Sequence, residues 1–124
     1  MIQLQALLAA AVVVIVAAGL LGLVSRQARG RALGLQAGPA GRAHILYFSG
    51  EGCTVCRTHQ EPALGRLDGV PVRKVDALAE RDLAQRFRVF TLPTTVVVDA
   101  SGRARHVNYG YAPLSKLEAQ LANL

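Results

Sequence analysis

Residues 47–57 read Tyr-Phe-Ser-Gly-Glu-Gly-Cys-Thr-Val-Cys-Arg, and this stretch holds both cysteines of the 124-residue chain. The run that leads into it, residues 45–48, is apolar and rich in β-branched and aromatic side chains, which predicts a buried strand. A short Ser-Gly-Glu-Gly loop follows, and the pattern becomes helical from Thr54. Cys53 is therefore expected where a loop ends and a helix begins, with Cys56 one turn later.

The expected position of Cys53 favours a reactive thiolate. At a helix N-terminus, unpaired backbone N–H groups and the positive end of the helix dipole stabilise an anion, and thiolates in such places are the reactive ones. The C-x-x-C spacing brings Cys56 within reach of Cys53. The pair is thus predicted to be a dithiol that can cycle, with Cys53 attacking and Cys56 resolving.

Two other interpretations of the cysteine pair remain open. A structural zinc site needs about four ligands, and only His59, or less plausibly His44 or His106, is available to add to the two sulfurs. A static disulfide is the second alternative. It would add little stability, because closing so short a loop restrains the unfolded chain little.

The N-terminal segment has the length and composition of a membrane anchor. Residues 6–24 form a run of nineteen residues without a charge, which at about 1.5 Å per residue is long enough to cross a bilayer. We expect residues 1–25 to form a retained transmembrane helix, with residues 2–24 in the membrane. A cleaved signal peptide is the alternative, but no Lys or Arg precedes the run and no small-x-small cleavage site is obvious.

Residues 26–42 are rich in Arg, Gly and Ala and contain several helix breakers, which predicts a flexible basic linker. Arg26, Arg29 and Arg31 follow closely behind the apolar run, whereas the other flank offers only the α-amino group. By the positive-inside rule, the C-terminal domain is expected in the cytoplasm, with the extracytoplasmic face as the alternative. The same arginines would meet anionic lipid head groups.

The basic charge of the chain has a simple explanation in this linker. Four linker arginines supply most of the net charge of +6, and the rest of the chain holds ten basic and eight acidic residues. No stretch interleaves aromatic with basic residues, so no nucleic-acid surface is expected.

The remaining residues, 43–124, alternate in the order β-α-β-α-β-β-α. The predicted strands are 44–49, 70–75, 94–99 and 104–109, and the predicted helices are 54–67, 78–89 and 113–124. The first two strands should be parallel and the last two an antiparallel hairpin around 100–103, giving an α/β fold on a mixed four-stranded sheet. Pro62 should kink its helix, and Leu78, Leu83 and Phe87 should line the buried side of the next one.

This element order, the C-x-x-C after the first strand, and Thr91-Leu92-Pro93-Thr94 before the third strand together resemble the thioredoxin family. The resemblance covers about two thirds of the chain. It implies a minimal thioredoxin-like fold in which Cys53 and Cys56 are catalytic. It also implies a cis bond before Pro93, a proline that packs against the dithiol, and a substrate-binding loop at Thr91, Leu92 and Pro93.

The chain departs from the family pattern at several positions. The Trp that usually precedes the first cysteine is missing, and Tyr47 stands where thioredoxins bury an acidic residue. The opening strand and helix of the family are also absent. Arg57 would add positive charge near the thiolate and Glu51 would oppose it, although a solvated helix position explains Arg57 equally well. His59 could relay a proton, but a surface position on the helix is the more common role of such a histidine.

The expected function is that of a membrane-tethered thiol-disulfide oxidoreductase acting on a protein disulfide or dithiol, with an upstream thiol donor. No bound cofactor is expected, since the dithiol carries the two electrons. A cytoplasmic domain would favour reductase action. The alternative from another class is a non-catalytic thioredoxin-like module whose groove holds a partner without turnover.

Overall fold

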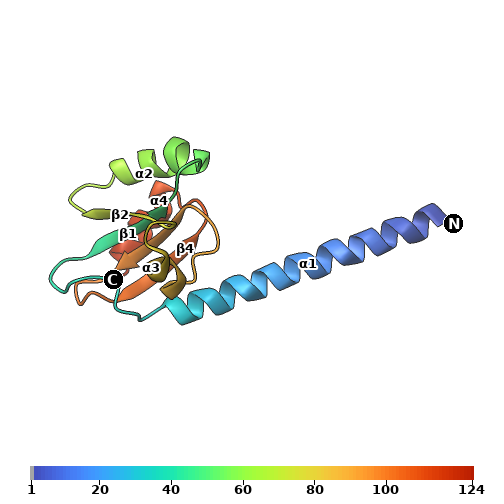
Figure 1. The fold of residues 1–124 in the computed structure, drawn as a ribbon, viewed down its shortest axis with the longest axis horizontal. Coiled ribbons are helices and arrows are strands. Elements are labelled where there is room, and N and C mark those ends of the chain that lie inside the picture. Colours follow the sequence, from blue (N-terminus) through green and yellow to red (C-terminus); the bar gives the residue numbers. More distant parts are fainter. Residues whose placement is uncertain (1) are drawn as a thin grey trace.

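A four-stranded sheet with helices on both faces forms the domain in the computed structural model, which describes residues 2–124 (Figure 1). The elements run α1 (Ile2–Ala32), β1 (His44–Ser49), η1 (Cys56–Gln60), α2 (Glu61–Gly65), β2 (Val72–Asp76), α3 (Arg81–Arg86), β3 (Thr94–Val98), β4 (Ala104–Tyr109) and α4 (Leu114–Ala122). The order of the elements after α1 confirms the predicted β-α-β-α-β-β-α sequence.

The strands lie in the order β2-β1-β3-β4. β1 pairs in parallel with β2 and antiparallel with β3, and β3 pairs antiparallel with β4. The sheet is therefore mixed, as the sequence predicts. β1 and β3 are central and nearly all of their residues are buried, which explains why both read as continuous apolar runs and not as alternating ones.

Side chains alternate across the sheet and build a separate core on each face. One core holds Phe48 with Phe87 from the segment after α3 and Ala32 from the end of α1. The other holds Tyr47 with Leu117 of α4 and also contains residues of η1 and α2. Burying a large apolar side chain contributes about 1.5–3 kcal/mol, so β1 contributes to the stability of both layers.

The end of α1 differs from the flexible linker predicted over residues 26–42. The helix continues to Ala32, and Ala28 and Ala32, one turn apart, are buried against the domain. The Arg29 Nε–H donates to the Val107 carbonyl of β4 at 3.1 Å. Small alanines permit this close approach, so tertiary packing extends the helix past the apolar run. Figure 1 shows the rest of α1 projecting away from the domain.

The segment after α1 is also attached to the domain. The Gly34 N–H donates to the Ala104 carbonyl and the Ala104 N–H donates to the Leu35 carbonyl, at 2.8 and 2.9 Å. Gln36 forms an isolated antiparallel bridge with Arg103. These bonds satisfy backbone groups near the start of β4 that would otherwise lie open at a sheet edge.

The helix after the dithiol loop contains a π-helical turn in place of a simple kink. Helical structure begins at Thr54, widens over η1 and resumes as α2, in which Pro62 lies in the first turn. Pro62 has no N–H to donate to the carbonyl four residues earlier. The Glu61 N–H instead donates to the Cys56 carbonyl five residues earlier, and such a wide turn is one of the usual sources of a helix bend.

The helix predicted over residues 78–89 is shorter, and Leu78 is not buried as predicted. The Asp76 carboxylate accepts hydrogen bonds from the N–H groups of Leu78 and Ala79, at 2.9 and 3.2 Å. This turn delays the helix to Arg81 and leaves Leu78 70% exposed. Phe87, in contrast, is fully buried, as the pattern predicts.

Candidate functional site

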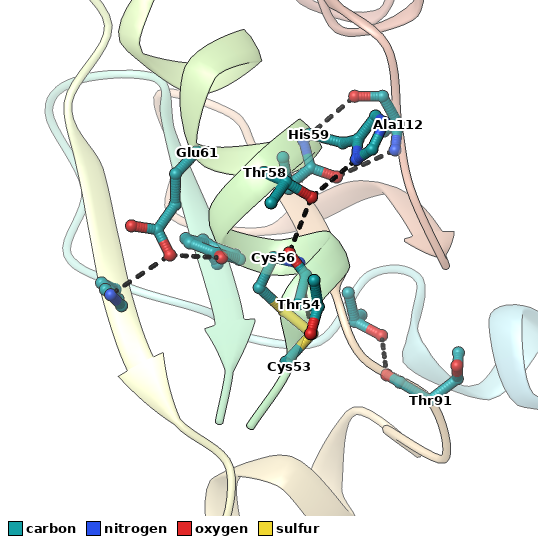
Figure 2. Close-up of a disulfide and its surroundings, with 12 residues drawn as sticks. Cys53, Thr54, Cys56, Thr58, His59, Glu61, Thr91 and Ala112 are labelled. Carbon is teal, nitrogen blue, oxygen red and sulfur yellow. Dashed lines mark hydrogen bonds and ion pairs between the residues drawn. A yellow bond between two sulfur atoms is a disulfide. The ribbon is translucent and has the colours of Figure 1, made fainter. Parts of the chain in front are cut away.

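Cys53 and Cys56 form a disulfide with their Cα atoms 5.3 Å apart. The strand β1 delivers the chain to a loop in which the Cys53 N–H donates to the Gly50 carbonyl at 3.3 Å. Gly52 has a φ of 77°, a conformation that suits a residue without Cβ. Figure 2 shows the disulfide at the start of the following helix, beside Thr54.

The two sulfur-bearing residues differ in exposure. Cys56 is 1% exposed and packs in the core with Ile45, Tyr47 and Leu117, whereas Cys53 is partly exposed at the edge of that core. The Cys56 N–H donates to Cys53 Sγ at 3.3 Å. A hydrogen-bond donor aimed at this sulfur, together with the positive end of the helix, stabilises negative charge on Cys53 when the disulfide is reduced.

The loop before β3 holds Thr91, Leu92 and Pro93, and the Leu92–Pro93 peptide bond is cis. The Pro93 carbonyl accepts from the Gly110 N–H at 2.8 Å, and the Thr94 hydroxyl donates to the Thr91 carbonyl at 2.8 Å. Both bonds hold the loop at the start of β3. Figure 2 shows Thr91 in the part of the chain next to the disulfide.

Leu92 links this loop to the dithiol. Its side chain packs against the core cluster that contains Cys56, as Cys53 also does. A Cβ placed on Gly50 would lie 2.9 Å from Leu92 Cδ1, closer than real contacts allow. The absence of a side chain at Gly50 therefore leaves room for the end of the Leu92 side chain in its present position.

Glu51, Arg57 and His59 lie around the dithiol but make different contacts. Glu51 and Arg57 are exposed and line one pocket of about 450 Å³. His59 Nδ1 lies 2.8 Å from the Thr58 hydroxyl, and its ring meets the edge of Tyr111 at 5.7 Å between centroids. The structure brings Cys53 and Cys56 together with Leu92, whereas Glu51 and Arg57 stay at the surface.

Tyr47, at the position where the resemblance places a buried acid, takes part in a polar network that the sequence did not indicate. Its hydroxyl donates to Glu61 Oε2 at 3.0 Å, and Lys74 Nζ lies 3.3 Å from the same oxygen. Burial, then the hydrogen bond and charge of Glu61, raise the pKa of Tyr47 above its ordinary value. The hydroxyl thus stays protonated beside the dithiol core at physiological pH. The Lys74–Glu61 pair is largely exposed and contributes little by itself.

Gln60 is a second residue that sequence reasoning missed. It is fully buried one turn after Cys56. Its side chain donates to the Ala112 carbonyl at 3.0 Å and accepts from the Ala112 N–H at 2.9 Å. These two bonds attach the segment that carries Cys56 to the loop between β4 and α4. A lone Gln at helical spacing from Cys56 was the available signal.

Within residues 2–124, no three or more His, Cys, Asp or Glu residues gather as a metal site would require. The zinc interpretation depends on His59, His44 or His106 joining the two sulfurs, and the structure assembles no such set. The pKa of His106 is lowered by burial and by the nearby charge of Arg105.

Comparison with known proteins gives a consistent result. Residues 35–124 match the family model of the thioredoxin-like domain. Thioredoxin-2 of the malaria parasite has a TM-score of 0.62 and 20% identity, covering 73% of this chain and 98% of its own. Fasciola hepatica thioredoxin has a TM-score of 0.58 and 25% identity, covering 68% of this chain and 82% of its own.

A third similar structure is the exposed lipoprotein thioredoxin of Streptococcus pneumoniae. It has a TM-score of 0.56 and 16% identity, and the alignment covers 68% of this chain and 86% of that one. No curated protein sequence matches the chain.

Proposed function

The chain belongs to the thioredoxin-like domain family, and from this premise we propose that it is a membrane-tethered thiol-disulfide oxidoreductase acting on a protein partner. The observation that carries the proposal is the asymmetry of the dithiol. Cys53 is partly exposed and accepts a hydrogen bond from the Cys56 N–H at 3.3 Å, whereas Cys56 is 1% exposed. The first thiol is accessible to a partner and the second is shielded.

In the reducing direction, the Cys53 thiolate attacks one sulfur of the partner's disulfide. The partner's S–S bond breaks, a Cys53–partner disulfide forms, and the other partner sulfur leaves as a thiolate and takes up a proton. Cys56 then loses its proton and attacks Cys53 Sγ, which breaks the mixed disulfide and releases the second partner thiol. Two electrons and two protons pass to the partner, and Cys53–Cys56 becomes the disulfide.

Thr91, Leu92 and Pro93 form the proposed docking loop for the partner. Leu92 packs against the dithiol core, and the loop is anchored through the Pro93 carbonyl to Gly110. The proposal needs no bound cofactor, since the cysteine pair carries both electrons. An upstream thiol donor must return the disulfide to the dithiol for another cycle.

The membrane tether in this proposal is α1. The helix is long and apolar enough to cross a bilayer, and its apolar window is fully exposed, unlike the core helix of a soluble protein. Arg26, Arg29 and Arg31 favour a cytoplasmic domain. A C-terminal reporter that is active only outside the cytoplasm should then be silent. A strong signal would place the domain on the extracytoplasmic face.

Trapping of mixed disulfides tests the roles of the two cysteines. Cys56→Ser leaves the attacking thiol without its resolving partner, so disulfide-linked complexes should accumulate. Cys53→Ser should not accumulate them. Equal trapping by the two variants would refute the assignment.

Insulin reduction with a dithiol donor separates turnover from binding. The wild type should reduce insulin and both cysteine variants should fail. A wild-type chain that retains a partner but does not reduce insulin would favour the alternative of a non-catalytic binding module.

A further inference from the structure

A pocket of about 450 Å³ lies between the end of α1 and the segment after α3. From α1 it is lined by Val24, Ala28 and Arg31, which share one face of the helix, and from the other side by Arg88 and Phe90. Val24 is the last residue of the apolar run. The pocket therefore begins where the proposed membrane span ends.

The two walls of this pocket are held in place. Ala28 and Ala32 are buried against the domain and the Arg29 side chain bonds to β4, so α1 enters the domain as a packed helix. Phe90 stacks on Tyr109 of β4, with ring centroids 4.8 Å apart. Because β4 contacts both walls, the position of Phe90 relative to Val24 is set by the fold.

Each wall of the pocket combines an apolar with a cationic side chain: Val24 and Arg31 on α1, and Phe90 and Arg88 on the segment after α3. Val24 and Phe90 are each 52% exposed. Among residues 2–124 the ion pairs are Arg73–Glu80, Lys74–Glu61 and Arg105–Asp99, so neither Arg31 nor Arg88 has an acidic partner.

The net charge around Arg31 and Arg88 is positive. Both also line an adjoining pocket, where Arg86 is a third cation and Asp82 the one carboxylate. Arg88 has a φ of 56°, which is uncommon for a residue with a side chain. Phe90 follows Arg88 after one intervening residue, so the exposed guanidinium and the exposed ring come from one short segment.

We propose that this pocket binds the head group of an anionic phospholipid and so docks the domain on the bilayer to which α1 anchors it. The inference rests on the membrane tether of the proposed function. With α1 across the membrane, Val24 lies at the boundary of the hydrocarbon and Arg31 two turns further out, at the level of the phosphates. Arginines bind phosphate, and an aromatic ring beside them fits the interface, where apolar and polar groups meet.

Docking in this way also positions the dithiol site. Phe90 is followed directly by Thr91, Leu92 and Pro93, the proposed docking loop for the partner. The bilayer surface thus lies next to this loop, and the partners within reach are protein disulfides close to the membrane.

A single tryptophan tests the proposal, because the chain contains none. Phe90→Trp and, as a matched control, Leu78→Trp are made in the full chain and reconstituted in vesicles that contain phosphatidylglycerol and brominated lipid. Leu78 is 70% exposed after β2, at the opposite edge of the sheet from β4. Bromine quenches only tryptophan that reaches the lipid, so the Phe90→Trp emission should be quenched and the Leu78→Trp emission should not.

The charge of the pocket is tested in the Phe90→Trp background. Arg88→Gln should lower the ratio of docked to undocked protein about fivefold, the typical effect of one arginine near an anionic surface. Arg66→Gln, on an exposed residue at the end of α2, should leave the ratio unchanged. Neutral vesicles, made of phosphatidylcholine with the same fraction of brominated lipid and no phosphatidylglycerol, should give weaker quenching than the anionic vesicles.

Several outcomes would overturn the proposal. These are quenching of Phe90→Trp no stronger than that of Leu78→Trp, quenching that is equal in neutral and anionic vesicles, and insensitivity to Arg88→Gln. An emission that is blue-shifted but not quenched, with a shift that increases with the protein-to-lipid ratio, would show that the tryptophan is buried against another protein molecule and not against lipid. Flotation of the chain with the vesicles reports separately on the tether: a chain that floats without quenching refutes docking alone, and one that does not float refutes the anchor as well.

Discussion

Replacing Gln60 by Leu tests whether its two buried hydrogen bonds hold the dithiol segment in place. The side chain is fully buried and bonds to both the carbonyl and the N–H of Ala112, which is itself fully buried. Leu has a similar volume but can make neither bond, so both backbone groups lose their partners. At about 1–3 kcal/mol for each unsatisfied buried group, Gln60→Leu should cost about 2–6 kcal/mol. This is a large fraction of the roughly 5–15 kcal/mol that stabilises a typical domain.

The second cysteine provides the assay. In a Cys53→Ser background, Cys56 is the sole thiol, and it is buried. Its labelling by a maleimide in increasing urea therefore reports unfolding of the domain in detergent. With an m-value of about 2 kcal/mol/M, a loss of about 4 kcal/mol moves the midpoint down by about 2 M. Gln85→Leu, on an exposed residue of α3, should change stability by less than about 0.5 kcal/mol.

An unchanged midpoint for Gln60→Leu would refute this reasoning. It would mean that Ala112 finds other partners and that the Gln60 bonds do not restrain the helix. A variant that unfolds at lower urea but labels slowly in native buffer would show that the bonds stabilise the domain without controlling access to Cys56.

Three further predictions concern the contact between the dithiol loop and the Leu92 loop, the joint at which α1 packs on the domain, and the turn between β3 and β4. Gly50→Ala places a Cβ 2.9 Å from Leu92 Cδ1 and should slow disulfide exchange, unlike Gly65→Ala, where the space is open; equal rates would rule out this contact as a constraint. Ala32→Leu overpacks a fully buried position and should cost about 1–3 kcal/mol in the urea midpoint, and no change would mean that the joint is loose. The hydroxyl and N–H groups of the β3–β4 turn lower the pKa of Asp99 from 3.8 to about 2, so its carboxylate stabilises the fold above pH 3.8 and this is lost as the pH falls through about 2. Asp99→Asn should accordingly lower Tm most at neutral pH, less near pH 2 and least below it, and a constant difference would contradict the linkage.

The fold could be predicted from the sequence where local pattern and tertiary role agree. β1 (His44–Ser49) and β4 (Ala104–Tyr109) have the bounds expected from the sequence, because the apolar run of β1 ends at a glycine-containing loop and β4 lies between the turn at 100–103 and Gly110. Hydrophobic periodicity could not predict that Leu78 is exposed. The Asp76 carboxylate accepts hydrogen bonds from the N–H groups of Leu78 and Ala79, and this turn takes the place of the first predicted turn of helix. Hydrogen bonds from a polar side chain to the nearby backbone compete with helix formation, and the spacing of hydrophobic residues carries no information about such bonds.

The joint between α1 and the domain shows a different limit. Read locally, the residues after the apolar run are rich in Arg, Gly and Ala, a composition typical of a linker. Their structure is decided by contacts far along the chain, from Arg29 to Val107 and from Gly34 to Ala104. The available signal was Ala28 and Ala32, two small residues one helical turn apart, which suit close packing of a helix on a sheet.

The candidate site divides in the same way. The cysteine pair could be recognised from its C-x-x-C spacing between a predicted strand and a predicted helix, and the loop at Leu92 from the resemblance to the thioredoxin family. The groups that support the dithiol come from elsewhere in the chain, since Gln60 bonds to a residue 52 positions away. Tyr47 likewise acquires its polar partner Glu61 only when the strand and the helix pack together.

The packed joint bears on how a partner reaches the dithiol. A domain on a long flexible tether could turn its active site in any direction, and the membrane would then only raise its local concentration. Here α1 enters the core through Ala32, and the loop that carries Leu92 follows directly on the residues that face α1 at the pocket. A helix fixed in the bilayer would therefore fix the orientation of the Cys53 edge as well. On the proposed function, selection of the partner would then depend on the height of its disulfide above the membrane in addition to its sequence. Lengthening the helix between Val24 and Ala28 should therefore change which disulfides are reduced before it changes the chemistry of the cysteine pair.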